Sequence, residues 1–249
     1  MTEITVHPIF RDRPPPNAKL WRYLSFAKFA ALLDAGQLHF TRIDQFDDHF
    51  EGVWPQKNYA KWQKVEPVEG VFTDNSFTET IRPAMAVSCW VESEYESAAM
   101  WRLYAPGNEG VAVVTSFRKL EEPVSQVAQQ PDWLGGVGRV RYFDHFNEEL
   151  MQDGEKNLLW PFMMKYISYA HEHEVRALVN APWGQNIAAD GLDLSIQLTD
   201  FIDEIVTSPF AQPWFDKTVR GVAERYGLGD RIRSSLLAPA NFYMTRGKK

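Results

Sequence analysis

The sequence predicts an α+β fold with a mixed, largely antiparallel sheet and flanking helices. Segments with the apolar pattern of strands outnumber those with helical spacing. Several strands also follow one another directly, which a regular strand–helix alternation does not produce. The chain has 249 residues, 45% of them apolar, which is enough to bury a substantial core. No polar linker divides it, so we expect a flexible N-terminal arm over residues 1–17 and a single domain over residues 18–249.

The first part of that domain reads as strand, helix and strand. Residues 19–25 (KLWRYLS) have a strand pattern, and the hydroxyl of Ser25 can accept a hydrogen bond from a free N–H of a following helix. Four apolar residues at helical spacing indicate that helix: Phe26, Phe29, Ala30 and Leu33. Gly36 supplies the left-handed stop, and residues 37–43 follow as a second strand.

The rest of the chain is expected to alternate buried strands with a few helices. The expected strands are residues 84–90, 110–116, 137–143, 174–179, 192–198, 204–209 and 232–237. The expected helices are residues 93–105, 155–171, which Pro161 interrupts, and 215–229. Residues 54–82 are polar and irregular, and predict a long loop or a lid.

Composition excludes several classes of protein. The formal net charge is −7, so the chain gives no strong signal for binding nucleic acid. The single cysteine, Cys89, excludes an intramolecular disulfide and an all-cysteine metal cage, and its apolar strand predicts an unreactive thiol. No run approaches the ~20 apolar residues of a membrane span. The polar N-terminal residues are not typical of a secretory signal, so we expect a cytoplasmic protein.

The stretch YAHEHEVRALV gathers charge at the start of an expected strand. Alternation along a strand would put Glu172, Glu174 and Arg176 on one face. In one interpretation Glu174 and Arg176 form a partly buried ion pair that satisfies itself. In another, Glu174 is a catalytic or ligand-holding carboxylate that Arg176 orients. In a third, His171 and His173 share a metal, but the local spacing indicates no third ligand, so we expect no metal.

Two further groups of residues are candidates for the site. In FDDHFEG, Asp48 and Glu51 either cap a helical turn or belong to a carboxylate cluster that holds a cation or pairs with Arg22 or Lys165. Trp101 and Tyr104, three residues apart on an expected helix, either pack in the core or form an aromatic wall for a flat ring. No phosphate-binding loop, dinucleotide fingerprint or nucleophile elbow occurs in the sequence.

The strand–helix–strand unit with Arg22, followed by a late Glu-x-Glu, resembles the layout of the ADP-ribosyltransferase superfamily. The resemblance implies that Arg22 holds a phosphate or ribose of NAD, that a residue such as Thr41 lines the nicotinamide pocket, and that Glu174 bonds the nicotinamide ribose. The chemistry needs such a glutamate, because breaking the glycosidic bond builds positive charge that a fixed carboxylate stabilises.

A second resemblance covers most of the chain. The segments LWRYLSF, LHFTRIDQFDDHFEG, VSCW, ESAAMWRLYAPGNEGVAVV, VRYFD, HEHEVRAL and IVTSP look like the bacterial domain-of-unknown-function family twenty-nine seventy-one. That family is named for its lack of an assigned activity. Some of its members are associated with phages and mobile elements, which implies a role in conflict or defence.

The sequence therefore leaves two classes of function. The first is an enzyme that uses NAD or another nucleotide, for glycosyl or ADP-ribosyl transfer or NAD cleavage, with Glu174 and Arg22 as catalytic residues. The second is a non-enzymatic binding or interaction module in a defence, toxin or phage system. In the first class, the residues expected to bind the nucleotide are Arg22, Tyr23, Thr41, Arg42, Asp48, Glu51, Trp101, Tyr104 and Arg176.

Overall fold

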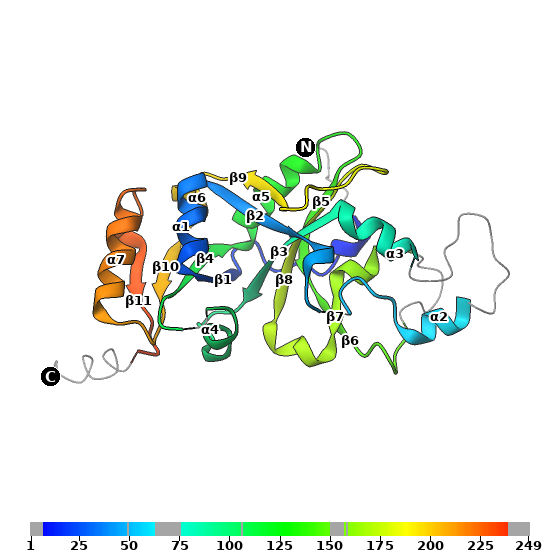
Figure 1. Cartoon of the computed structure of the whole chain (residues 1–249), viewed down its shortest axis with the longest axis horizontal. Coiled ribbons are helices and arrows are strands. Elements are labelled where there is room, and N and C mark those ends of the chain that lie inside the picture. The colour runs from blue at the N-terminus through cyan, green and yellow to red at the C-terminus, as the bar shows by residue number, and fades with distance from the viewer. Residues whose placement is uncertain are drawn as a thin grey trace. The chain divides into compact units, whose positions relative to one another are not determined.

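The α+β class is confirmed by the computed structural model of the chain, which describes residues 7–48, 50–62, 76–105, 107–149, 157 and 159–238 (Figure 1). The strands are β1 (Lys19–Ser25), β2 (Gln37–Arg42), β3 (Met85–Glu92), β4 (Gly110–Ser116), β5 (Leu134–Arg139), β6 (Arg141–Phe143), β7 (Met164–Tyr166), β8 (Glu174–Asn180), β9 (Leu192–Ser195), β10 (Glu204–Thr207) and β11 (Ile232–Ser234). The α-helices are α1 (Phe26–Ala35), α2 (Gln56–Trp62), α3 (Ser76–Ile81), α4 (Ala98–Tyr104), α5 (Phe117–Val127), α6 (Leu198–Phe201) and α7 (Pro213–Glu224). The 3₁₀ helices are η1 (Pro8–Phe10), η2 (Ile43–Gln45), η3 (Arg82–Ala84), η4 (Trp160–Met163), η5 (Ile167–Glu172) and η6 (Gly229–Arg231).

The chain forms two compact units, each built from three segments. The first unit consists of Met1–Pro14, Phe40–Cys89 and Val124–Leu192. The second consists of Pro15–His39, Trp90–Pro123 and Asp193–Lys249. The strands β2, β3 and β9 and the helix α5 contribute residues to both units. A single domain over residues 18–249 remains a prediction.

In the second unit the strands are mixed and largely antiparallel. Strand β1 pairs with β4 along its whole length, from Lys19 opposite Ser116 to Ser25 opposite Gly110. Strand β10 runs antiparallel to β4, and β11 runs parallel to β10. On its other side β1 pairs with the end of β3, where Trp21 lies opposite Val91. The predicted sheet type is therefore confirmed.

Helix α1 begins and ends as the sequence predicts. The hydroxyl of Ser25 accepts a hydrogen bond from the backbone N–H of Lys28, at 3.4 Å. The helix ends at Gly36, whose φ of 60° lies in the left-handed region that glycine adopts without strain. Its buried residues are Phe29, Leu32 and Leu33. The capped helix thus buries one apolar stripe, as its spacing indicates.

The first unit combines four strand pairings with a core of its own. Strand β5 runs antiparallel to β8, and β8 also pairs with β3. Strand β2 runs antiparallel to β3, with Thr41 opposite Val87. The short strands β6 and β7 form a parallel pair. The core of this unit contains Ile9, Phe10, Ile43, Ile81, Met85, Val87, Phe162, Met163 and Leu178.

The described part of the expected N-terminal arm is packed. Phe10 is 1% exposed, and it lies so close to Gly136 of β5 that a Cβ on that glycine would come within 2.3 Å of the phenyl ring. The backbone N–H of Arg139 donates to the carbonyl of Asp12, at 2.7 Å. Ile9 and Phe10 are buried, whereas Arg11 and Asp12 are exposed. The flexible arm expected over residues 1–17 remains a prediction.

The expected helix over residues 155–171 is wrong where the structure describes it. Residues from 159 onward form η4, β7 and η5 rather than an α-helix. Pro161 fits only the first turn of a helix, and the run from Pro161 to Lys165 is buried throughout, so it has no polar face to turn toward water. In the expected loop or lid, α2 and α3 occupy the two ends, and residues 63–75 lie outside the described part. No helix in that part is long and apolar enough to span a membrane.

Candidate functional site

Five charged side chains of the first unit meet in its interior. We call Glu51, Lys165, Glu172, Glu174 and Arg176 the charge cluster. Their exposed fractions are 1%, 8%, 4%, 3% and 0% respectively. Charged residues are rarely buried unless they are paired, so the pairing within this group explains how the core holds them.

Glu174 is the carboxylate that joins the two cations. Its Oε1 accepts a hydrogen bond from Nε of Arg176 at 2.7 Å, and its Oε2 accepts one from Nζ of Lys165 at 3.1 Å. Its backbone N–H donates to the hydroxyl of Tyr142 at 2.7 Å. The two side-chain bonds orient the carboxylate, and the third fixes the backbone at the first residue of β8.

Each cation also binds a second carboxylate. Both terminal nitrogens of Arg176 donate to Glu51, and Nη1 donates to the carbonyl of Phe162 at 2.8 Å. Nζ of Lys165 donates to Glu172 at 2.5 Å. Glu51 is therefore a partner of Arg176 and does not complete a capping box. Asp48 instead accepts the backbone N–H of Phe50 at 2.9 Å, which closes a local turn.

The local backbone explains why both glutamates of Glu-x-Glu reach the cluster. The expected strand alternation from His171 onward is wrong, because η5 runs to Glu172 and β8 begins only at Glu174. His173 between them has φ 44°, in the left-handed region that non-glycine residues seldom adopt. That turn lets Glu172 join Glu174 and Arg176 without a shared strand face.

The electrostatics of the cluster favour an ionised Glu174. Burial alone opposes the charge, but Arg176 and Lys165 outweigh it and lower the pKa of Glu174 to about 2. The carboxylates in turn raise the pKa of Lys165 and of Arg176, although burial acts in the opposite direction. Burial raises the pKa of the Glu51 carboxyl. The cluster therefore sets three carboxyl groups against two cations.

Cys89 of β3 lies against the same carboxylate. Burial raises the pKa of its thiol, and the charge of Glu174 raises it further. A raised pKa disfavours the thiolate, which is the nucleophilic form. This agrees with the expectation of an unreactive thiol.

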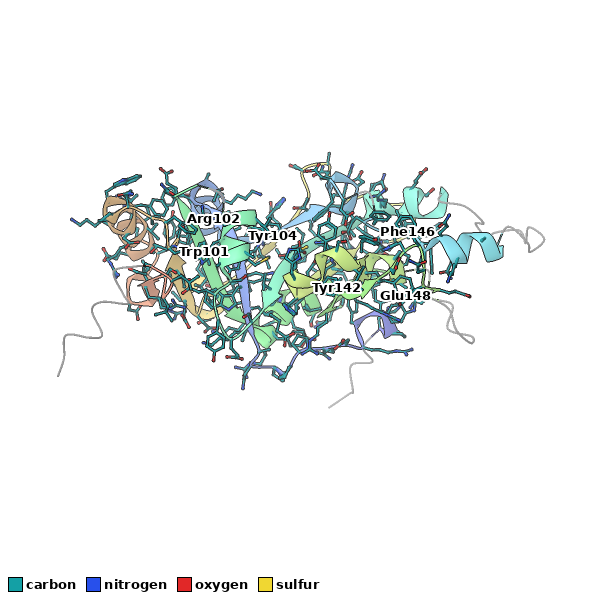
Figure 2. The ribbon with its side chains drawn as sticks, turned by 90° about the horizontal axis from the view of Figure 1, so that it is seen from below. Trp101, Arg102, Tyr104, Tyr142, Phe146 and Glu148 are labelled. Atoms are coloured by element: carbon teal, nitrogen blue, oxygen red, sulfur yellow. The ribbon has the colours of Figure 1, made fainter. Side chains whose placement is uncertain are left out.

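The aromatic candidates lie in the second unit (Figure 2). Trp101 of α4 is 0% exposed and packs edge-on against Tyr23, with ring centroids 4.9 Å apart. The Tyr23 hydroxyl accepts the backbone N–H of Ser97 at 2.8 Å. These two rings are core residues, whereas Tyr104 is 45% exposed. Of the expected aromatic wall, only Tyr104 presents a ring to solvent.

Arg22 also belongs to the second unit, where it lies 5.7 Å from the Trp90 ring and donates to the His39 carbonyl at 3.2 Å. Arg42, in the first unit, binds both oxygens of Asp44, at 2.7 and 2.8 Å. Thr41 of β2 lies in the pairing with β3.

Three of the predicted site residues therefore meet in the charge cluster: Glu51, Glu174 and Arg176. A site shared by Arg22 and Glu174 remains a prediction. The residues expected to form the site did not include Lys165 or Tyr142, although the sequence offered Lys165 as a partner for the carboxylates of Asp48 and Glu51. The only signal for Lys165 was a lysine in an apolar run. In the described part of the chain, no three His, Cys, Asp or Glu side chains gather as a metal site would require.

Comparison with known proteins gives a limited result. No family profile and no curated protein matches the chain, so the resemblance to the domain-of-unknown-function family remains a prediction. Among solved structures, the chain is similar to Thermus sp. 2.9 DarT in complex with NAD+, with a TM-score of 0.37 at 12% identity, over 90% of this chain and 96% of that one. DarT from the same organism in complex with ADP-ribosylated ssDNA matches with a TM-score of 0.36 at 12% identity, over 91% and 96%.

Proposed function

We propose that this protein is an enzyme that acts on NAD or a related nucleotide, with Glu174 as the carboxylate that stabilises positive charge in the reaction. The observation that carries the proposal is the geometry of Glu174, whose two carboxylate oxygens are fixed by hydrogen bonds from Arg176 and Lys165. Functional sites hold carboxylates with specific charge partners in this way, as structural ion-pair networks also do.

The electrostatics of Glu174 support this role. Arg176 and Lys165 keep Glu174 ionised in a setting of low dielectric constant, whereas burial favours the neutral form of Glu51. In transfer from NAD, the bond between the ribose and the nicotinamide breaks, and its electron pair leaves with the nicotinamide. The ribose carbon then carries positive charge until an acceptor oxygen or nitrogen bonds to it. A fixed, ionised carboxylate such as that of Glu174 stabilises that stage of the reaction.

The remaining roles follow from the chemistry of the ligand. A pyrophosphate needs a planar cation, which Arg22 can supply through its guanidinium group. A flat ring needs an exposed aromatic face, for which Tyr104 is the candidate because Tyr23 and Trp101 are buried. The role of Arg22 follows the layout that resembles ADP-ribosyltransferases, in which a first-strand arginine holds a phosphate or ribose of NAD.

Calorimetry and thermal shift with NAD, ADP-ribose and ATP test the proposal, together with chromatographic detection of released nicotinamide. We expect at least one nucleotide to bind and nicotinamide to be released from NAD. Glu174→Gln should abolish that release while nucleotide binding persists, when measured well below the melting temperature of the variant. Glu94→Gln, which changes an exposed glutamate, serves as the matched control and should keep full activity.

A second candidate function is a non-enzymatic interaction module. It is favoured by the fact that all five charges of the cluster are paired and buried, as a structural ion network would be. No heat and no thermal stabilisation with any of the three nucleotides at millimolar concentration would reject the enzyme and leave the module. Unfolding of Glu174→Gln at all temperatures would point the same way.

A further inference from the structure

The backbone of Glu174 lies just beyond the end of a strand pairing. The register of β5 with β8 ends where Arg139 lies opposite Val175, so Glu174 is one residue past the last pair. His173 before it is in the left-handed region, which turns the chain at this point. The pairing with β5 therefore does not by itself hold the residue whose carboxylate joins the two cations.

Two groups from the segment that follows β5 bind this backbone instead. The backbone N–H of Val140 donates to the Glu174 carbonyl at 2.9 Å, and the hydroxyl of Tyr142 accepts the Glu174 N–H at 2.7 Å. Buried backbone groups almost always have a partner, and these two bonds supply one for each backbone group of Glu174. Of the two partners only Tyr142 uses its side chain, so a substitution can remove that bond alone.

Strands β6 and β7 place Tyr142 (labelled in Figure 2) beside a second group that binds Glu174. In this parallel pair Tyr142 lies opposite Lys165, whose Nζ donates to the Glu174 carboxylate at 3.1 Å. One short strand of the pair thus holds the backbone of Glu174, and the other holds its side chain. The β6–β7 pair is therefore a mount for this single glutamate.

The hydroxyl of Tyr142 is neutral. Burial raises the pKa of Tyr142 above its ordinary value of 10, and the charges of Glu174 and Glu172 raise it further, although the bond from the Glu174 N–H and the charge of Lys165 act in the opposite direction. A neutral phenol accepts the N–H through its oxygen and keeps its own proton. Tyr142 therefore holds Glu174 without adding a charge to the charge cluster.

We propose that Tyr142 is a positioning residue, which fixes the backbone of Glu174 so that the carboxylate stays between its two cations. Without the hydroxyl, the residue between the left-handed His173 and the paired Val175 is free to move, and its carboxylate moves with it. A displacement of about 1 Å at a reacting group costs on the order of 100-fold in rate. The effect on catalysis rests on the proposed function of Glu174, whereas the effect on its position does not.

Steady-state kinetics of Tyr142→Phe, which removes only the hydroxyl oxygen, test the catalytic effect. We expect kcat for nicotinamide release to fall by about 10- to 100-fold and KM for NAD to change by less than about twofold, because Tyr142 holds Glu174 and not the nucleotide. Tyr226→Phe is the matched control. It removes a hydroxyl that also forms one hydrogen bond, to Asp34 at 3.4 Å in the second unit, and should keep wild-type activity.

Two NMR measurements follow Glu174 itself and need no nucleotide. In Tyr142→Phe the backbone amide of Glu174 should exchange its hydrogen about tenfold faster, while the other amides of β8 keep their rates. The pKa of the Glu174 carboxyl should rise by about one unit from its value of about 2, because the carboxylate spends less time between its two cations. A general loss of stability would not change this pKa.

A wild-type pKa of Glu174 in Tyr142→Phe would overturn the proposal whatever happens to kcat, since the carboxylate would not have moved. A wild-type kcat in this variant would overturn it as well. So would rapid exchange of the Glu174 amide in the unmutated protein, which decides the question even if Tyr142→Phe does not fold. No release of nicotinamide by the wild type would reject the proposed function alone, because exchange and titration still test the position of Glu174.

Discussion

At the residue scale, Arg176 shows how a wholly buried cation is accommodated. Its guanidinium group binds Glu174 on one edge and Glu51 on the other, and it also donates to a backbone carbonyl. A planar fork with several donors suits this position, and the single ammonium of a lysine does not. The same group therefore fixes a carboxylate from the start of β8 and one from the turn after β2.

Acid should destabilise the protein through Glu174. Its pKa is about 2 in the folded state and 4.5 ordinarily, so its contribution is complete above pH 4.5 and is lost as pH falls toward 2. The loss should be on the order of 3 kcal/mol in the free energy of unfolding. Urea unfolding at a series of pH values measures it, and Glu174→Gln should flatten the curve in this window.

Glu51 provides a control, because the pH dependence of its contribution to stability has the opposite sign to that of Glu174. Burial raises its pKa, so its contribution is complete below the ordinary value and declines as pH rises. Glu51→Gln should therefore leave the acid-induced loss in place. If Glu174→Gln and the wild type lose stability equally between pH 4.5 and 2, Glu174 is not the ionised centre of the cluster.

The sequence predicts contacts correctly where the two residues are close together in the chain. Glu174 and Arg176 are two residues apart on one strand, so alternation alone predicts that they meet. Lys165 reaches the same carboxylate through a change of direction in η5 and the left-handed His173. No propensity predicts a histidine in that conformation, so the contact of Lys165 with Glu172 and Glu174 could not be predicted.

At the scale of elements, local sequence signals predicted helix α1 correctly. They also predicted a helix over residues 155–171, which the structure does not form where it describes these residues. The hydroxyl cap at Ser25 and the glycine stop at Gly36 act within one helical turn, so the sequence contains them in full. In contrast, the run from Pro161 to Met164 is apolar and buried throughout, and an apolar run without periodicity does not distinguish a strand from a helix.

The packing of η1 on β5 predicts a mutational effect. Gly136→Ala should destabilise the protein by about 1–3 kcal/mol, because the added Cβ overlaps the ring of Phe10. Phe10→Ala destabilises on its own, but in that background the further cost of Gly136→Ala should fall toward zero. Chemical denaturation of the two single variants and the double variant measures this coupling.

Gly221 offers the matched control for that experiment. It lies inside α7, and a Cβ there would meet nothing within 4 Å. Gly221→Ala should therefore stabilise the protein by about 0.5–1 kcal/mol, since alanine loses less backbone entropy in a helix. Full additivity of Phe10→Ala and Gly136→Ala would contradict the close packing of η1 against β5.

At the scale of the whole molecule, each unit draws on segments from both halves of the sequence. In the second unit β4 pairs with β10, and in the first β3 pairs with β8, so partners lie many residues apart. Contacts of this kind leave no local trace in a single sequence. This is why the division into two interleaved units could not be predicted, although the fold class could.

The interleaving predicts that the chain cannot be divided into two folding halves. Cutting after Pro123 separates β3 from β8 and β4 from β10, so neither residues 1–123 nor residues 124–249 should unfold cooperatively alone. Circular dichroism with thermal melting measures this, and the intact chain is the reference. A cooperative transition in either fragment would show that one unit is self-sufficient.

The position of Cys89 makes its thiol a chemical probe of the charge cluster. The chain has one thiol, and it lies against Glu174 at the centre of the charge cluster. Cys89 is only partly buried, and a disulfide reagent modifies it when the sulfur is accessible and ionised. The rate of modification of native, unmutated protein therefore reports how accessible this part of the core is. Comparing that rate with and without a nucleotide would report occupancy of the site without any assay of turnover.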